Sequence, residues 1–177
     1  MSNYDNVIVE LSDYVATVTL NRPEKKNCMS PALHAEMAEV MRDMDWKQVK
    51  VLVITGVAES FCAGMDLEGC FLEPFDDLEK MEEINTNGFS WFTAVKNCPA
   101  VTIAKVNGWC FGGGMELAGI CDIVLAANES VWGLSEVNFG IFPGGGTTWS
   151  YAHNMPARKQ ALYYALTAET FTGEQGV

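Results

Sequence analysis

Residues 100–119 read AVTIAKVNGWCFGGGMELAG and pass from a strand pattern to a helix pattern through three consecutive glycines. The run 100–106 is short, apolar and rich in branched side chains, which is typical of a buried strand. Residues 112–119 are long enough for one short helix. In α/β proteins, ligands collect at the carboxyl ends of strands, where a helix N-terminus presents unpaired N–H groups to negative charge. The segment therefore predicts a ligand site around residues 107–117.

Other parts of the chain also have strand patterns. Residues 49–55 and 122–127 are short apolar runs and are predicted to be buried strands. Residues 7–11 and 14–20 alternate apolar and polar side chains, which predicts two half-buried strands joined by a tight turn. A hairpin therefore opens the predicted fold.

Helix patterns separate these strands. The pair Ser30-Pro31 supplies an N-cap and a first-turn proline, and apolar side chains then recur at helical spacing to about residue 45. A longer helix is predicted to start in the acidic stretch 73–83 and to run through residues 91–92, and residues 85–88 are candidates for a break in it. Strands that alternate with helices place the chain in the α/β class.

Three loops combine glycine with a position between a predicted strand and a helix: residues 61–67 (FCAGMDL), 107–117 and 132–146 (WGLSEVNFGIFPGGG). Glycines at such places can simply form turns, or they can let a ligand approach the backbone. Glu116 follows the glycine triplet and Glu136 lies in the third loop. A single carboxylate near a helix N-terminus is often only a dipole partner. Two carboxylates beside backbone donors can hold one proton and accept another, as the addition of water to a double bond requires.

Composition limits the other classes of function. The chain has 177 residues, 49% of them apolar, which predicts one domain over residues 1–177 with a packed core. A net charge of −12 disfavours nucleic acid as a partner. Neither a signal-peptide pattern nor a membrane-length apolar run occurs, so we expect no membrane association and a cytoplasmic location.

Metal-ligand and common catalytic patterns are also missing from the sequence. The six cysteines form no Cys-x-x-Cys pair, and neither His34 nor His153 lies at ligand spacing from one, so we expect no metal site and reduced, mostly buried thiols. No phosphate-binding P-loop string occurs, and the glycine triplet lacks the spacing of a dinucleotide fingerprint. Gly133-x-Ser135 is followed by Val137 where a nucleophile elbow needs glycine.

One basic cluster stands out in this acidic chain. Arg22, Lys25 and Lys26 crowd into a single predicted turn. The cluster can be a solvated turn that aids solubility, or it can attract an anionic small ligand.

Four motifs in a fixed order resemble the crotonase (enoyl-CoA hydratase/isomerase) superfamily: residues 21–23, 61–67, 107–116 and 136–146. The resemblance implies a crotonase-like spiral of strand-strand-helix units that assembles as a homotrimer or a dimer of trimers. It implies an acyl-CoA thioester as substrate and no cofactor, since coenzyme A is part of the substrate. Family members continue beyond the position of Val177 with helices, so the C-terminal helical region is expected to be missing from this sequence.

The resemblance also implies roles for individual residues. The backbone N–H groups of Met65 and Gly113 match an oxyanion hole that stabilises a thioester enolate. Glu116 and Glu136 match the two carboxylates that hold the attacking water in hydratases of the family. The positions expected to bind the substrate, with the basic cluster at its nucleotide part, are Arg22, Lys25, Lys26, Ala63, Gly64, Asp66, Leu67 and Gly112.

Three functions follow from this resemblance. An enoyl-CoA hydratase is the first, because both carboxylates are present. The second is a hydroxycinnamoyl-CoA hydratase-lyase. The residues of four motifs resemble those of such enzymes: 29–31, 63–67, 107–114 and 133–136. The third is an acyl-CoA-binding or assembly subunit without catalytic activity.

Overall fold

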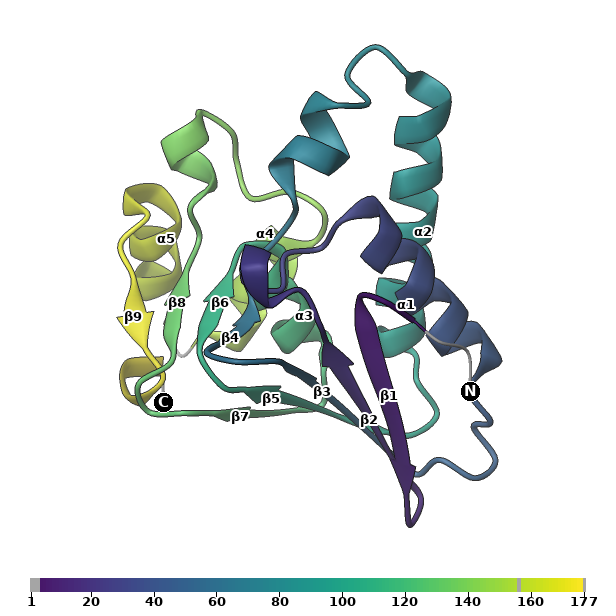
Figure 1. The fold of residues 1–177 in the computed structure, drawn as a ribbon. Coiled ribbons are helices and arrows are strands. Elements are labelled where there is room, and N and C mark those ends of the chain that lie inside the picture. Colours follow the sequence, from purple (N-terminus) through teal and green to yellow (C-terminus); the bar gives the residue numbers. More distant parts are fainter. Residues whose placement is uncertain (1–3, 156, 177) are drawn as a thin grey trace.

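The structure, a computed structural model, describes residues 4–155 and 157–176. Two sheets form its framework (Figure 1), with the strand orders β1-β2-β3-β5-β7 and β4-β6-β8-β9. The larger sheet contains β1 (Val7–Ser12), β2 (Val15–Leu20), β3 (Val51–Gly56), β5 (Val101–Val106) and β7 (Ile123–Ala126). The smaller sheet contains β4 (Ser60–Cys62), β6 (Trp109–Phe111), β8 (Val131–Gly133) and β9 (Phe171–Thr172).

Strands of the larger sheet lead into short strands of the smaller one: β3 into β4, β5 into β6, and β7 into β8. Strands β2, β3, β5 and β7 run parallel to one another, and so do β4, β6 and β8, whereas the edge strands β1 and β9 are antiparallel to β2 and β8. Parallel neighbours need crossover connections, which α1 (Pro31–Asp43), α2 (Leu78–Lys96) and α3 (Gly113–Ile120) supply. The chain therefore winds as a spiral of strand-strand-helix units, which confirms the predicted α/β class and architecture.

Helix α1 begins as its sequence predicts. The hydroxyl oxygen of Ser30 accepts a hydrogen bond from the N–H of Leu33 at 3.1 Å, which satisfies one of the free donors of the first turn. The side chains of Leu33 and Met37 are buried on one face of α1, and Trp91 of α2 is fully buried in the same core. The two helices lie side by side against the larger sheet (Figure 1) and enclose the core with it.

Helix α2 begins inside the acidic segment, as predicted. It starts at Leu78, where the Asp77 side chain caps it by accepting from the N–H of Lys80 at 3.0 Å. Residues 85–88 do not break the helix. Ile84, Trp91 and Val95 bury one face of α2 on both sides of this polar segment and hold it in helical conformation.

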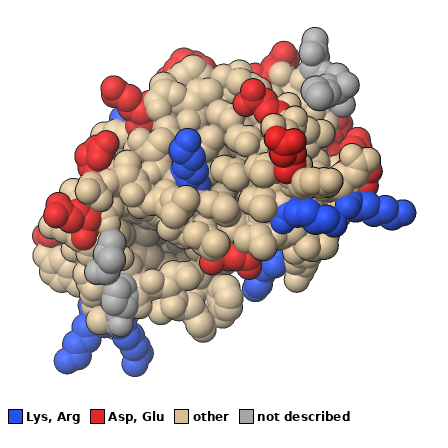
Figure 2. Space-filling model, turned by 90° about the horizontal axis from the view of Figure 1, so that it is seen from below, with Lys and Arg blue, Asp and Glu red and all other residues tan. Residues whose placement is uncertain are grey.

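Strand β7 corrects the prediction of a buried strand at residues 122–127. All four of its residues are exposed, and it lies at the edge of the larger sheet. An apolar run indicates a strand, but it does not reveal whether another element covers it. Figure 2 looks at the lower side of the molecule, where β5 and β7 run in Figure 1, and shows few charged side chains at the centre of that face.

Several elements follow the third glycine-rich loop or lie between the main ones. Helices α4 (Thr147–Asn154) and α5 (Arg158–Thr167) precede β9. Short helical turns occupy η1 (Pro23–Lys25), η2 (Glu68–Leu72), η3 (Glu136–Phe139) and η4 (Glu174–Gly176), of which η2 is π-helical. Val177 lies outside the described residues. Among the described helices, none combines the length and apolar character needed to cross a membrane.

Candidate active site

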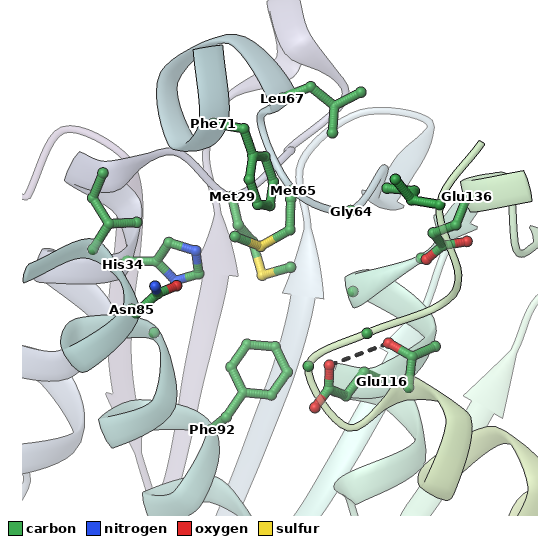
Figure 3. Close-up of a pocket in the computed structure, with 18 of the residues that line it drawn as sticks. Met29, His34, Gly64, Met65, Leu67, Phe71, Asn85, Phe92, Glu116 and Glu136 are labelled. Carbon is green, nitrogen blue, oxygen red and sulfur yellow. Dashed lines mark hydrogen bonds between the residues drawn. The ribbon is translucent and has the colours of Figure 1, made fainter. Parts of the chain in front are cut away.

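A cavity of about 450 Å³ opens between α2, the start of α3 and residues 135–147. This volume lies within the range of small-molecule sites. Figure 3 shows side chains pointing into it from two opposite sides, with His34 and Phe92 on one side and Glu116 and Glu136 on the other. Much of its wall is apolar and is formed by residues that include Met29, Met65, Phe71, Ile84, Phe89 and Phe92. Its polar lining includes His34, Asn85, Glu116 and Glu136.

Two unpaired backbone donors lie at this cavity. Met29 forms a parallel bridge with Met65, in which Met29 N–H donates to Gly64 O at 2.8 Å and Asp66 N–H donates to Met29 O at 3.0 Å. This pattern uses the residues on either side of Met65 and leaves its own N–H without an acceptor among the described residues. Gly113 is the first residue of α3, where an N–H group has no partner within the helix. Both N–H groups are therefore available to a ligand.

Glycines bring these two donors together. Gly64 has a φ of +94°, which side chains rarely allow, and a Cβ there would lie 3.0 Å from Phe111 O and 3.5 Å from Gly113 N. Gly112 has a φ of +48°, and a Cβ there would lie 3.0 Å from the Glu136 Oε1 atom. Because Gly64 has no side chain, the loop after β4 lies in close contact with the loop before α3.

Glu116 projects from the first turn of α3 toward the cavity (Figure 3). Its Oε2 atom accepts a hydrogen bond from the Thr147 hydroxyl at 3.3 Å. Burial raises the pKa of this carboxyl to about 7, and the hydrogen bond from Thr147 offsets only part of that effect. Glu116 can therefore give or take a proton near neutral pH.

Glu136 reaches the same cavity from η3. Burial raises its pKa, and a backbone hydrogen bond offsets part of the effect. Its Oε2 atom is buried and has no hydrogen-bond partner among the described residues. A buried carboxylate oxygen without a partner is costly, so Glu136 is suited to bind a water molecule or a polar ligand atom.

Comparison with known proteins places this geometry in a family. Residues 10–176 match the family described as enoyl-CoA hydratase/isomerase. The chain belongs to this family. It is 41% identical over 182 residues to a hydroxycinnamoyl-CoA hydratase-lyase of Pseudomonas fluorescens, covering 99% of this chain and 66% of that protein. It is 34% identical to a mevalonyl-coenzyme A hydratase of Aspergillus fumigatus, covering 92% of this chain and 59% of the relative.

Solved structures of the family agree with the fold. Pseudomonas aeruginosa AtuE superposes with a TM-score of 0.85 at 30% identity, covering 96% of this chain and 66% of the other. Human enoyl coenzyme A hydratase domain-containing protein 3 superposes with a TM-score of 0.86 at 26% identity and a coverage of 97% and 66%. The chain thus spans about two thirds or less of the length of these relatives. The resemblance to the crotonase superfamily is confirmed.

Several of the residues expected from the family resemblance meet at the cavity. Met65 and Gly113 lie beside each other, and Glu116 and Glu136 enter from α3 and η3. Four of the expected substrate-binding residues also line the cavity: Ala63, Gly64, Leu67 and Gly112.

Arg22 and Asp66 lie outside the cavity lining and bind each other. Their side chains are 14% and 11% exposed and join at 3.0 Å between Arg22 Nη1 and Asp66 Oδ2. Arg22 also donates to Cys28 O at 2.8 Å. Burial opposes ionisation of Asp66, but the hydrogen bond from Arg22 and smaller favourable contacts leave its pKa lowered. The pair ties the turn after β2 to the loop after β4 and so supports the Met65 bridge.

The lysines of the basic cluster are more open. Lys25 Nζ lies 3.4 Å from Glu68 Oε2, and both side chains are more than half exposed, so this ion pair is weak. Lys26 Nζ lies over the Trp109 ring, 3.5 Å from its centroid. Lys26 is therefore held beside an exposed aromatic surface.

Sequence reasoning missed the wall of the cavity that α1 and α2 provide. His34, Asn85, Phe89 and Phe92 line the cavity but were not predicted as site residues. Asn85, Phe89 and Phe92 recur at helical spacing, so an unbroken course for α2 would have placed them on one face. His34 is buried.

Replacing Glu116 by glutamine is expected to stabilise the protein at alkaline pH. The folded pKa of about 7 lies above the ordinary value of 4.5, so the stabilisation from holding the proton is complete below about pH 4.5 and is lost as pH rises through 7. Glutamine does not titrate. The free energy of unfolding of the variant relative to wild type should therefore rise by roughly 1–3 kcal/mol between about pH 4.5 and pH 8.5.

Urea unfolding at the two pH values measures this difference. Glu129→Gln, at an exposed position, is the matched control and should show no such rise. A stability difference for Glu116→Gln that does not change with pH would mean that Glu116 is not desolvated in the folded protein.

Proposed function

We propose that this chain carries the active site of an enoyl-CoA hydratase. The observation that supports it is the pairing of two free backbone donors, Met65 and Gly113, with two half-buried carboxyl groups, Glu116 and Glu136, at one cavity. Membership of the enoyl-CoA hydratase/isomerase family adds the substrate class, an acyl-CoA thioester.

The proposed reaction uses each of these groups once. The N–H groups of Met65 and Gly113 donate to the thioester oxygen and stabilise the negative charge that develops there. The carboxylate of one glutamate takes a proton from water as its oxygen bonds to C3 of the enoyl group. The other glutamate, protonated at the start, delivers its proton to C2 of the resulting enolate. One water is consumed, and the two carboxyl groups exchange protonation states, which the Glu116 pKa of about 7 favours near neutral pH.

Adding the 177-residue chain to crotonyl-CoA should remove the absorbance of the conjugated enoyl thioester. The initial rate of this absorbance loss should be proportional to the enzyme concentration, and the loss should stop at the hydration equilibrium. A folded chain that binds acetyl-CoA in calorimetry but leaves the absorbance unchanged would instead support a non-catalytic acyl-CoA-binding subunit.

The second candidate is an aromatic hydratase-lyase. It is supported by the 41% identity to the hydroxycinnamoyl-CoA hydratase-lyase and by the aromatic cavity wall of Phe71, Phe89 and Phe92. In the additional step, the 3-hydroxyl of the hydrated thioester gives up its proton to a base, the C2–C3 bond breaks as C3 becomes an aldehyde, and C2 takes up one proton to give acetyl-CoA. Mass spectrometry of a feruloyl-CoA reaction should then detect aldehyde and acetyl-CoA. Detection of the hydrated thioester alone would reject the lyase step.

The remaining expectations rest on the composition and residue patterns of the sequence and on the family resemblance. We propose that the chain works as a single domain in the cytoplasm, without a cofactor or a metal, as a homotrimer or a dimer of trimers. The described residues contain no group of three or more His, Cys, Asp or Glu side chains arranged to hold a metal ion.

A further inference from the structure

His34 is a buried polar residue that the proposed reaction does not use. It lies on α1, its side chain is only 1% exposed, and it lines the cavity. Its Nδ1 atom is 2.9 Å from Nε1 of Trp91, which is itself fully buried in α2. The imidazole is therefore held in one orientation by a hydrogen bond between two helices.

This hydrogen bond fixes where the imidazole carries its proton. An indole N–H can only donate, so Nδ1 of His34 must accept and the proton of the neutral ring must sit on Nε2. Burial lowers the pKa of His34 to about 4, so the ring is neutral at physiological pH. His34 thus presents an N–H donor at Nε2, and this atom has no hydrogen-bond partner among the described residues.

The Nε2 atom is buried at the cavity wall, so only a group that enters the cavity can pair its N–H. A Cβ at Gly88 of α2 would lie 3.4 Å from both Cε1 and Nδ1, so α2 packs closely against that side of the ring. Asn85, one helical turn before Gly88, lines the same cavity and is exposed. Figure 3 shows His34 and Asn85 on the wall opposite Glu116 and Glu136, with Met29 and Met65 between them.

We propose that His34 is a specificity-determining residue that selects acyl groups carrying a hydrogen-bond-accepting oxygen away from the thioester. The inference rests on the proposed function in one respect: the thioester carbonyl occupies the Met65 and Gly113 end of the cavity, which places the far end of the acyl group toward α1 and α2. There the walls are apolar except for His34 and Asn85. An alkyl group in this position leaves the buried N–H unpaired, whereas a hydroxyl or ether oxygen satisfies it.

A pair of unreactive ligands tests this selection. The para-methoxy and para-ethyl forms of phenylpropionyl-CoA have nearly the same shape, and only the methoxy form offers an oxygen acceptor. Calorimetry on the wild-type chain should give about tenfold tighter binding of the methoxy ligand. Since both ligands are saturated, the ratio of their dissociation constants is measured whether or not the chain turns over an enoyl thioester.

Two substitutions assign the preference to His34. His34→Phe removes the donor and should bring the ratio close to one. His34→Gln keeps an amide that can accept from Trp91 and donate to the cavity, so it should restore part of the preference. Because each ratio compares two ligands on the same variant, a general loss of affinity or of folded protein does not affect it.

The outcomes separate this inference from the proposed function. Equal affinities of the wild type for the two ligands would overturn the role of His34, even if crotonyl-CoA is hydrated. The same holds for a preference that persists fully in His34→Phe. A preference that depends on His34, in a chain that hydrates nothing, would support the inference and reject the hydratase. Failure to bind either ligand would overturn the role of His34, whereas turnover of crotonyl-CoA alone decides the hydratase.

Discussion

Glu136→Gln is expected to lower kcat for the hydration of crotonyl-CoA by about 10²–10⁴-fold, the usual contribution of a general acid or base. The amide keeps the size of the carboxyl group but cannot act as a general acid or base. Since Glu136 acts on water rather than on coenzyme A, the dissociation constant of a saturated acyl-CoA should change little. Steady-state kinetics and calorimetry measure the two quantities separately.

The matched control is Glu39→Gln, at an exposed position of α1 that does not line the cavity. It makes the same change of charge and should keep the wild-type kcat. Undiminished turnover in Glu136→Gln would remove Glu136 from the acid–base pair. Loss of turnover together with loss of acyl-CoA binding would instead mean that Glu136 shapes the site.

Gly113→Ala is expected to lower kcat/KM for crotonyl-CoA by about 10²–10³-fold, the effect of removing one oxyanion-hole donor. A Cβ on Gly113 would lie 3.9 Å from both Gly64 Cα and Met65 Cγ, and 2.5 Å from Met29 Cε. The methyl group would therefore fill the space between the two loops, beside the N–H groups to which the thioester oxygen is proposed to bind. Met29 can move its terminal methyl aside, so the fold should survive.

Met65→Leu tests whether the backbone N–H or the side chain of Met65 is required at the other donor. It changes the cavity wall but keeps the N–H, so it should cost much less in kcat/KM than Gly113→Ala. Urea unfolding of both variants checks that the fold is intact. Equal losses in two folded variants would count against a backbone oxyanion hole.

Local patterns in the sequence predicted the framework well. The alternation at residues 14–20, the Ser30 cap of α1 and the apolar strand before the glycine triplet are all properties of short segments, and each is present in the structure. The glycine positions also indicated where other groups approach the backbone closely: the Phe111 and Gly113 backbone at Gly64, and the Glu136 side chain at Gly112.

Properties that depend on distant partners could not be predicted in this way. Arg22 resembled a free cation in a basic cluster, yet its partner Asp66 lies 44 residues away in the sequence and brings its charge into a buried pair. The raised pKa of Glu116 arises from burial beneath the loop that contains Thr147. Similarly, only the packing of α2 against α1 shows that His34 and Trp91 meet.

The central claim is that Met65 and Gly113 donate together to a thioester oxygen. A crystal structure of the protein with a saturated, unreactive acyl-CoA tests it most directly. The proposed geometry predicts the thioester oxygen at about 2.7–3.1 Å from both backbone nitrogens, with Glu116 and Glu136 facing the carbons next to it. A bound acyl-CoA whose thioester oxygen contacts neither nitrogen would contradict the claim.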